Sequence, residues 1–504
     1  MKLNSKIKNV IIEVICLLFI LLFIYAAVSK ILDFENFKVQ LAQSPMLSIY
    51  AEWIPWSVIA FELIIALLLA LSFTKTLGLF LSLGLMTMFT VYIFILLHFS
   101  AFVPCSCGGV LEKMSWNVHL IFNCVFIAMA LYAIVLKEGI LNRNMLFFRN
   151  FKTVTLSIGI TLISTLTVMV LFWTSEQVMY HDNPFIRRYP QHPAEFIEKA
   201  DLKYSSYYFA GSVGTRIYLA NYKYPSYFLS MNSDLKRQKI EKIQLNPKQI
   251  PFKMITSSIQ YPYFYLADGG VPIILRGEVK DWKVTTEMKG SPYFTKAVAI
   301  DGTRIAVRSN SVKSLTNILG IFSPDSVPRV RFHKELLQKQ IDGIFDTDGT
   351  LLYSSESGRI VYLYYYRNEF IVADKNGKLV KRLRTIDTIT KAKLKVASMS
   401  NGKEFAMSSP SFIVNANASL RGNLLFVHSK VKGRYENEKV WKTSFIIDVY
   451  DINRGVYILS FPIFHTAFHE LSALMVTKTH LYAVIGTDLA AYELKKGITK
   501  EFND

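Results

Sequence analysis

Five apolar runs in the first 174 residues constrain the fold of this 504-residue chain more than any other feature. They cover residues 10–28, 54–71, 77–97, 116–136 and 154–173. Each run, as a helix of about 20 residues, is long enough to cross a hydrocarbon core of roughly 30 Å. The sequence therefore predicts an α-helical membrane bundle of four helices, followed by a fifth helix that tethers the rest of the chain.

The basic residues of the short connections predict how these helices are oriented, because lysine and arginine stay on the cytoplasmic side of a membrane. With the N-terminus inside, the inner segments of residues 1–174 hold eight basic residues and the outer loops hold three. We therefore expect a cytoplasmic N-terminus, and we expect the fifth helix to deliver residues 175–504 to the outside.

Four segments follow from the change in composition along the chain. Residues 1–140 are predicted to form the four-helix membrane domain, and residues 141–174 an inner loop and the fifth helix. Residues 175–200 contain three prolines and are predicted to be a linker. Residues 201–504 are predicted to form an all-β soluble domain, because short strands rich in Tyr, Val, Ile and Phe alternate with Gly, Asp and Asn.

A loose repeat within residues 201–504 indicates the architecture of the soluble domain. A turn followed by an apolar strand recurs at residues 214–219, 263–267, 301–307, 348–353, 421–427 and 478–484. This spacing is near the roughly 40–50 residues expected of propeller blades with insertions. A six- or seven-bladed β-propeller is therefore predicted, and a pair of β-sandwiches is the rival architecture.

The formal net charge of +19 lies mostly in the soluble domain. Residues 175–504 hold 46 basic and 31 acidic residues. Such a surface is compatible with an acidic glycan, anionic lipid headgroups or an acidic protein, as well as with simple solvation. The basic residues are scattered without a stacking-aromatic motif, so no nucleic-acid partner is predicted. No hydrolase triad, phosphate loop or HExxH pattern appears in this domain.

The outer loop between the third and fourth helices contains a CxC pair, Cys105 and Cys107. A disulfide between cysteines this close in sequence is strained, and a strained disulfide is easier to reduce and better suited to exchange. Lys113, in the same loop, is a positive group that would favour the reactive thiolate. Cys105 and Cys107 are therefore the candidate catalytic residues.

Three other interpretations of the CxC pair stay open. The pair could form a structural disulfide, it could be incidental, or Cys107 could bind zinc or copper with His98 or His119. The remaining cysteines, Cys16 and Cys124, are predicted to be small buried apolar side chains.

Polar residues inside the predicted helices mark a second candidate feature, because such residues usually face the interior of a bundle and have functions. Trp116, His119 and Asn123 lie on one face of the fourth helix. His119 is a candidate proton shuttle or quinone contact, with Asn123 and Glu62 as further candidates. Glu62, deep in the second helix, is expected to be protonated or paired with His119 or with a polar group of the first helix.

The first 140 or so residues resemble the MauE/DoxX group of redox-associated membrane proteins. Residues 26–37, which include Lys30 and Asp33, resemble the group's small-x-x-Lys-x-x-Asp-Phe signature, and residues 61–63 resemble its acidic entry to the second helix. Residues 104–109, followed by Trp116, His119 and Asn123, resemble its cysteine-bearing form. The resemblance implies four membrane spans and a part in extracytoplasmic disulfide or electron handling, with Lys30, Asp33, Trp116 and Lys113 in supporting roles.

These observations lead to one principal hypothesis and two alternatives. The principal hypothesis is a bacterial inner-membrane thiol–disulfide component, with its propeller in the periplasm recruiting a client. Its partners would be a periplasmic thiol protein or a thioredoxin-like protein, and membrane lipid. Quinone is the one cofactor considered, as an electron acceptor. The alternatives are a non-enzymatic anchored propeller that binds a protein or glycan, and a metal-handling membrane protein. The sequence decides neither whether the chain is an enzyme nor its oligomeric state.

Overall fold

The computed structural model describes residues 5–34, 37–38, 41, 47, 50, 52–98, 116–138, 147–177, 185–245, 252–311, 315–394, 396–399, 404–407, 412–464 and 470–502. The chain divides into two compact units. One comprises residues 1–191 with residues 434–437, and the other comprises residues 192–433 and 438–504.

The first unit is built from long apolar helices. They are α1 (Ser5–Leu32), α3 (Ile54–Ala70), α4 (Lys75–His98), α5 (Trp116–Glu138) and α6 (Phe147–Gln177). In the described part of the chain, α1, α4, α5 and α6 are long and apolar enough to cross a membrane. The apolar helix α3 has 17 residues, which at 1.5 Å per residue is shorter than a hydrocarbon core.

Close approach between helices depends on glycine at two positions of α4. A Cβ atom at Gly78 would lie 2.8 Å from the side chain of Leu69, which is on α3. A Cβ atom at Gly84 would lie 3.3 Å from both Ile160 and Ser164 on α6. Small residues let helix backbones approach closely in membranes, where packing replaces the hydrophobic effect as the main attraction. The helix α6 is therefore packed closely against α4.

The second unit consists of antiparallel four-stranded sheets. The first sheet comprises β2 (Tyr207–Val213), β3 (Arg216–Asn221), β4 (Tyr227–Asn232) and β5 (Lys239–Lys242). The second comprises β6 (Thr256–Gln260), β7 (Tyr263–Asp268), β8 (Ile273–Glu278) and β9 (Lys283–Glu287). The third comprises β10 (Lys296–Ala299), β11 (Ile305–Asn310), β12 (Asn317–Phe322) and β13 (Val330–His333).

The fourth sheet comprises β14 (Gly349–Ser354), β15 (Arg359–Tyr364), β16 (Glu369–Asp374) and β17 (Leu379–Arg384). The fifth comprises β20 (Asn415–Arg421), β21 (Leu424–Ser429), β22 (Ser444–Asp451) and β23 (Val456–Phe464). The sixth comprises β24 (Leu471–Val476), β25 (His480–Ile485), β26 (Asp488–Leu494) and β1 (Ala194–Asp201). A two-stranded hairpin, β18 (Val396–Met399) and β19 (Glu404–Met407), and the short helices α7 (Glu438–Thr443) and α8 (Lys496–Thr499) complete the unit.

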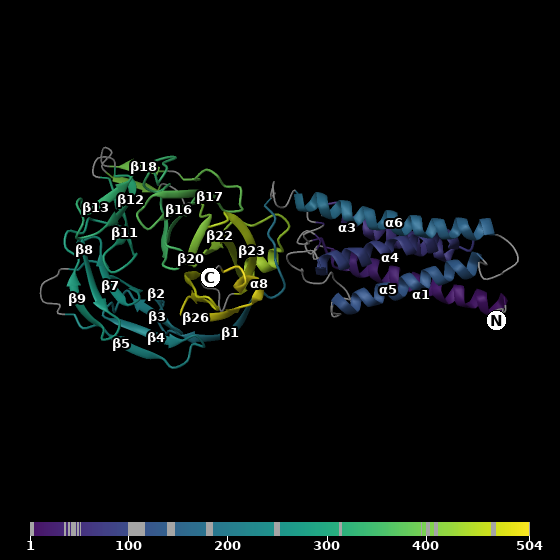
Figure 1. The fold of residues 1–504 in the computed structure, drawn as a ribbon, viewed down its shortest axis with the longest axis horizontal. Helices are drawn as coiled ribbons and strands as arrows, with labels where there is room; N and C mark the ends of the chain where they lie inside the picture. Colours follow the sequence, from purple (N-terminus) through teal and green to yellow (C-terminus); the bar gives the residue numbers. More distant parts are fainter. Residues whose placement is uncertain are drawn as a thin grey trace. The chain divides into compact units, whose positions relative to one another are not determined.

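These six sheets are the blades of a closed β-propeller (Figure 1). The first strands of successive blades contact one another around the ring, and β2 contacts β24 to close it. The predicted helical region followed by an all-β propeller is therefore confirmed, with six blades, and the β-sandwich alternative is wrong. We number the blades I to VI from β2–β5 to β24–β26 with β1.

Burial differs systematically between the strands of a blade. The second strand is almost continuously buried, as in β21, where every residue is buried, because neighbouring blades cover both of its faces. The fourth strand faces solvent and carries charges, as in β5 and β9. The hydrophobic core of the unit therefore lies between the blades.

The ring is closed by the two ends of the unit. Strand β1 pairs antiparallel with β26, from Ala194 opposite Leu494 to Asp201 opposite Asp488, and so supplies the outermost strand of blade VI. Strand β1 lies within residues 175–200, which the sequence analysis assigned to a linker, except for its last residue. Its mostly exposed, charged sequence has no apolar alternation that would identify it as a strand.

Candidate functional site

The loop that carries the CxC pair connects the end of α4, at His98, to the start of α5, at Trp116. Cys105, Cys107 and Lys113 lie outside the described residues, as does the predicted metal-binding combination that includes Cys107. Of the remaining candidate residues, His98 ends α4, Trp116, His119 and Asn123 lie in the first turns of α5, Lys30 lies near the end of α1, and Glu62 lies in the middle of α3.

A buried ion pair joins α1 to α3. The Nζ atom of Lys30 donates a hydrogen bond to Oε1 of Glu62 across 2.7 Å, with Glu62 only 1% exposed and Lys30 16% exposed. Lys30 also lies over the ring of Phe37, 5.7 Å from its centroid. This is the pairing with a first-helix group that the sequence allowed for Glu62, and it leaves His119 outside the pair.

The predicted polar face of α5 is present. The rings of Trp116 and His119 stack with their centroids 6.3 Å apart, and both side chains are half-buried. Asn123, one further turn along the helix, is buried. Asp33 lies beyond the end of α1, where its backbone carbonyl accepts a hydrogen bond from Phe37.

Three buried polar atoms in this region have no hydrogen-bond partner among the described residues. They are Oε2 of Glu62, Nε1 of Trp116 and Nδ2 of Asn123. Buried polar atoms are normally paired, so each of these groups is available to another hydrogen-bonding group. We refer to Lys30, Glu62, Trp116, His119 and Asn123 together as the helix-end polar cluster.

The other two described cysteines differ in exposure. Cys16 is buried on α1, as expected. Cys124 is exposed on α5, so the prediction of burial is wrong there, because position 124 follows Asn123 and turns away from the buried face. Among the described residues, no group of three or more His, Cys, Asp or Glu side chains is arranged to hold a metal ion.

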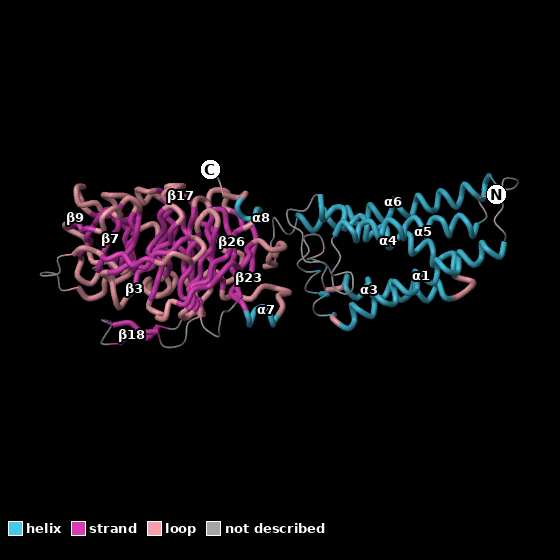
Figure 2. Tube along the Cα trace, turned by 90° about the horizontal axis from the view of Figure 1, so that it is seen from below, coloured by secondary structure: helices cyan, strands magenta, loops and turns pink. Residues whose placement is uncertain are grey.

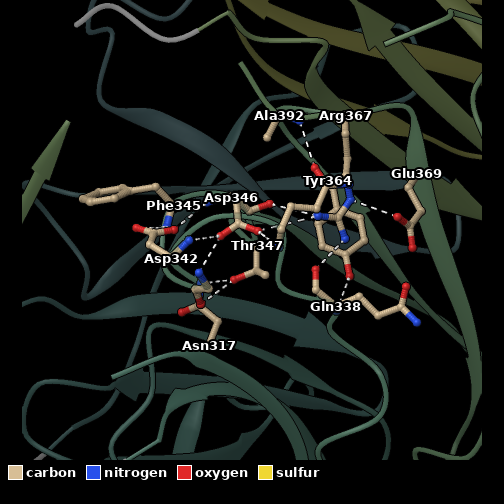
Figure 3. A network of polar contacts seen from close by, with 12 residues as sticks. Asn317, Gln338, Asp342, Phe345, Asp346, Thr347, Tyr364, Arg367, Glu369 and Ala392 are labelled. Atoms are coloured by element: carbon tan, nitrogen blue, oxygen red, sulfur yellow. Dashed lines mark hydrogen bonds and ion pairs between the residues drawn. The ribbon is translucent and has the colours of Figure 1, made fainter. Parts of the chain in front are cut away.

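A second polar network lies within the propeller, and the sequence analysis did not identify it (Figure 3). Arg367, which is fully buried, donates to Glu369 across 2.9 Å and to the backbone carbonyl of Gln338 across 2.9 Å. Its guanidinium stacks on Tyr364 at 3.6 Å and lies 3.8 Å from the buried carboxylate of Asp346.

Asp342 and Asp346 bind the backbone of the connection that precedes blade IV. Asp346 accepts N–H groups of Gln340, at 2.6 Å, and of Asp342 and Gly343. Burial raises the pKa of the Asp342 carboxyl, and the neighbouring Asp346 adds to the rise. For Asp346, burial is outweighed by hydrogen bonds from Asp342 and from the backbone, which together hold its pKa below the usual value.

These contacts identify the Arg367 network as structural. All three guanidinium nitrogens have partners, as do both carboxyl groups, and every partner belongs to blade IV or to the connection before it. A fully paired buried network stabilises one conformation of a loop and leaves no group to bind a ligand. The helix-end polar cluster, in contrast, has unpaired groups.

Comparison with known families decides what the helical unit resembles. Residues 8–136 match the family model of methylamine utilisation protein MauE. The match to MauE covers α1, α3, α4 and nearly all of α5, and thus the whole helix-end polar cluster. The helix α6 and the propeller lie outside the MauE match. A search of curated proteins found no significant match.

The solved structures similar to this chain align with more than half of it. A member of the DUF4221 family from Bacteroides vulgatus is 12% identical, with a TM-score of 0.40 and coverage of 60% of this chain and 99% of that one. BamB from Moraxella catarrhalis is 11% identical, with a TM-score of 0.30 and coverage of 56% and 85%. Virginiamycin B lyase from Staphylococcus aureus is 11% identical, with a TM-score of 0.34 and coverage of 59% and 99%. Similarity at this level carries no argument about function.

Proposed function

We propose that this protein is a membrane component of thiol–disulfide exchange for exported proteins, and that its propeller recruits the client. Cys105 and Cys107 are the proposed exchanging pair. The match of residues 8–136 to MauE supports a membrane protein of this class. The proposed setting is the bacterial inner membrane, with the N-terminus in the cytoplasm and the propeller in the periplasm.

The helix-end polar cluster is the observation that carries the proposal. An ion pair and unpaired polar atoms at membrane depth are energetically unfavourable, and where they occur they usually serve a function. Here they lie on α1, α3 and α5, and α5 begins directly after the CxC loop. Disulfide exchange moves protons as well as electrons, and the helix-end polar cluster supplies groups that can carry protons.

The proposed exchange consists of two successive attacks by the thiolates of the client. A thiolate of the client attacks the Cys105–Cys107 disulfide, forming a mixed disulfide and releasing one cysteine thiolate, which takes up a proton. The second client thiolate then attacks the mixed disulfide, forming the client disulfide and releasing the other cysteine. Two electrons and two protons have then passed to the CxC pair. His119, one turn into α5, is the proposed proton shuttle.

Quinone is the proposed acceptor of the two electrons and two protons when the CxC pair is reoxidised. The donors that fit quinone carbonyl oxygens are Nε1 of Trp116 and Nδ2 of Asn123, since both are buried and have no described partner. Lys30 holds Glu62 in place through the 2.7 Å ion pair.

Alkylation trapping of the full-length protein in membranes tests this proposal. Cys105 and Cys107 should be oxidised at rest, become alkylated after incubation with a reduced dithiol protein such as thioredoxin, and become resistant again after reoxidation. His119→Ala should slow the exchange while leaving the resting state oxidised. Cys124→Ser, which changes an exposed cysteine of α5, is the matched control and should have no effect.

Two results would reject the proposal in favour of its alternatives. If Cys105 and Cys107 stay reduced and unreactive toward oxidants, and Cys105→Ser/Cys107→Ser protein still complements a deletion strain, the chain acts as an anchored binding propeller. If purified protein holds stoichiometric zinc or copper that Cys107→Ser abolishes, the chain handles metal through Cys107 with His98 or His119.

A further inference from the structure

One face of the propeller gathers the connections between blades and those between the second and third strands of each blade. Antiparallel pairing within each blade sends these two kinds of connection to the same edge, which we call the channel face. The hairpin β18–β19 and the helix α7 belong to it, and α8 lies on the opposite face (Figure 2). Residues 202–206, 222–226, 288–295 and 365–368 are among the connections on the channel face.

Four side chains from blades I, III and IV form two contacting pairs at the channel-face ends of their strands. Tyr208, on the innermost strand of blade I, stacks on Tyr222 with ring centroids 4.3 Å apart. Lys296, at the start of the innermost strand of blade III, donates a hydrogen bond to the hydroxyl of Tyr365 across 3.2 Å. The hydroxyl of Tyr208 is fixed in turn by the backbone N–H of Ser257, at 2.7 Å.

The two halves of this group face each other across the ring. Blades I and IV are opposite one another in a six-bladed ring. Partial desolvation raises the pKa of the Tyr222 phenol, although its side chain as a whole is 56% exposed, and the Tyr365 phenol on the opposite blade raises it further. Tyr208, Tyr222, Lys296 and Tyr365 therefore line the mouth of the central channel.

A buried carboxamide with an unpaired donor directly precedes Tyr222 in the chain. Asn221 is only 3% exposed, and its Nδ2 atom has no hydrogen-bond partner among the described residues. Its Oδ1 atom is occupied by Lys223 N–H and by the hydroxyl of Ser206, at 2.8 and 3.0 Å. Asn221 thus presents a free N–H donor to an acceptor that approaches this loop.

Basic residues predominate in the channel-face connections of blades I to III. Within their described part, these connections contain no Asp or Glu, although Asp201, Asp268 and Glu287 end strands at this face. The carboxylate of Asp268 is buried and accepts backbone N–H groups of Lys253 and Met254. Five lysines lie in these connections or at the mouth of the channel: Lys203, Lys223, Lys253, Lys289 and Lys296. None of them forms an ion pair with a described carboxylate.

Several other lysines of the propeller are paired with carboxylates. Lys239 is paired with Glu241 at 2.8 Å, Lys280 with Glu278 at 2.5 Å, and Lys199 with Asp488 at 3.3 Å. The channel-face connections of blades I to III therefore carry positive charge that no described carboxylate pairs. That pattern is complementary to an acidic partner.

Exposed tyrosines extend this surface outward from the mouth. Tyr204, Tyr224 and Tyr293 are all more than half exposed and lie on channel-face connections of blades I and III. Tyrosine provides large, rigid contact area at low entropic cost and is enriched in protein-binding surfaces. A patch that reaches from the mouth across several blades is larger than a small anion needs, which favours an extended chain.

We propose that the channel face binds an acidic, extended segment of a partner protein, with a carboxylate of that segment on Lys296 and its backbone or side chains between Tyr222 and Tyr365. The inference rests on the proposed function only in taking this partner to be the client.

Fluorescence polarisation with the full-length protein in detergent tests the inference. The probes are a short fluorescein-labelled peptide of alternating Glu and Ala residues and the same peptide with Gln in place of Glu. The acidic peptide should bind, and the Gln peptide should not. Lys296→Gln should weaken binding about tenfold, because it removes a charge-assisted hydrogen bond. Tyr222→Ala should weaken it by a similar factor.

The matched control is Lys239→Gln, which removes the same charge from an outer strand and should leave binding unchanged. Equal loss in Lys296→Gln and Lys239→Gln would overturn the inference, since it would indicate attraction by net charge alone. Tight binding of a heparin oligosaccharide with no binding of the acidic peptide would also overturn it, in favour of an acidic glycan.

The same measurement on Cys105→Ser/Cys107→Ser protein separates this inference from the proposed function. Peptide binding should be unchanged in that variant. If alkylation trapping finds no thiol exchange but the peptide still binds through Lys296, the redox proposal fails and the binding surface stands. If exchange proceeds but no peptide binds, the binding surface fails and the redox proposal stands.

Discussion

At the scale of single residues, the buried ion pair between Lys30 and Glu62 is the interaction of the helical unit whose loss we expect to affect stability most. Burying two charges is unfavourable unless each compensates the other, so removing one partner is far more damaging than removing both. Because Glu62 is almost fully buried, its carboxylate has no access to water if Lys30 is lost.

We therefore predict that Lys30→Met destabilises the protein by about 3–5 kcal/mol. The double variant Lys30→Met/Glu62→Leu should recover most of this loss, because no uncompensated charge remains. Unfolding of the purified protein in detergent, monitored by circular dichroism, measures both.

The control for this prediction is the pair formed by Lys75 and Glu13, in which Glu13 is 56% exposed. An exposed pair contributes little, so Glu13→Gln should change stability by no more than about 1 kcal/mol. A double variant as unstable as Lys30→Met would contradict the argument from charge compensation.

The sequence could identify Glu62 but not its partner. A carboxyl group within an apolar run can be recognised from the sequence alone. The polar face made by Trp116, His119 and Asn123 can be recognised in the same way. Lys30 counts as a loop residue by its position at the end of a run. Only the packing of α1 against α3 brings its flexible side chain back to Glu62. The channel mouth was missed for a similar reason, because Tyr222 and Tyr365 are 143 positions apart and meet only when the ring closes.

At the scale of elements, the contact between α4 and α6 depends on the side-chain size at position 84. We predict that Gly84→Leu separates α6 from α4, since a side chain there would collide with Ile160 and Ser164. Overpacking of this kind costs about 1–3 kcal/mol. The midpoint of thermal unfolding in detergent should fall accordingly.

Gly159, on α6, provides the control. A Cβ atom there meets no other atom within 4 Å, so Gly159→Leu places its side chain in open space. It should leave the unfolding midpoint unchanged or raise it slightly, because leucine favours the helical conformation more than glycine does. Similar destabilisation by both substitutions would mean that α4 and α6 do not pack as described.

The repeat that predicted the propeller was readable because of where it falls in the blades. Five of its six copies coincide with a second strand: β3, β7, β11, β21 and β25. These strands are buried on both faces and are therefore continuously apolar in sequence. The copy at residues 348–353 coincides instead with β14, the first strand of blade IV, because Asp348-Gly349 resembles the turn that precedes the other copies. The exposed fourth strands carry no such signal.

At the scale of the whole molecule, the propeller depends on β1 for closure. We predict that a chain beginning at His192 forms a soluble propeller that unfolds in one cooperative transition. A chain beginning at Leu202 lacks β1, exposes the edge of β26, and should aggregate or unfold over a broader range of denaturant. Urea unfolding monitored by tryptophan fluorescence distinguishes them. Equal cooperativity in the two chains would show that closure through β1 contributes nothing.

Closure by β1 also sets the order of events during synthesis. Strand β1 ends at Asp201, but its partner β26 ends at Leu494, so the first strand made must wait for the last. At about 5–20 residues per second, that wait lasts tens of seconds. During it, β1 is an unpaired strand that could pair with another chain. Its exposed charged residues, among them Glu195, Glu198 and Lys199, oppose such pairing. The poor strand signal that hid β1 in the sequence thus protects the nascent chain until the ring can close.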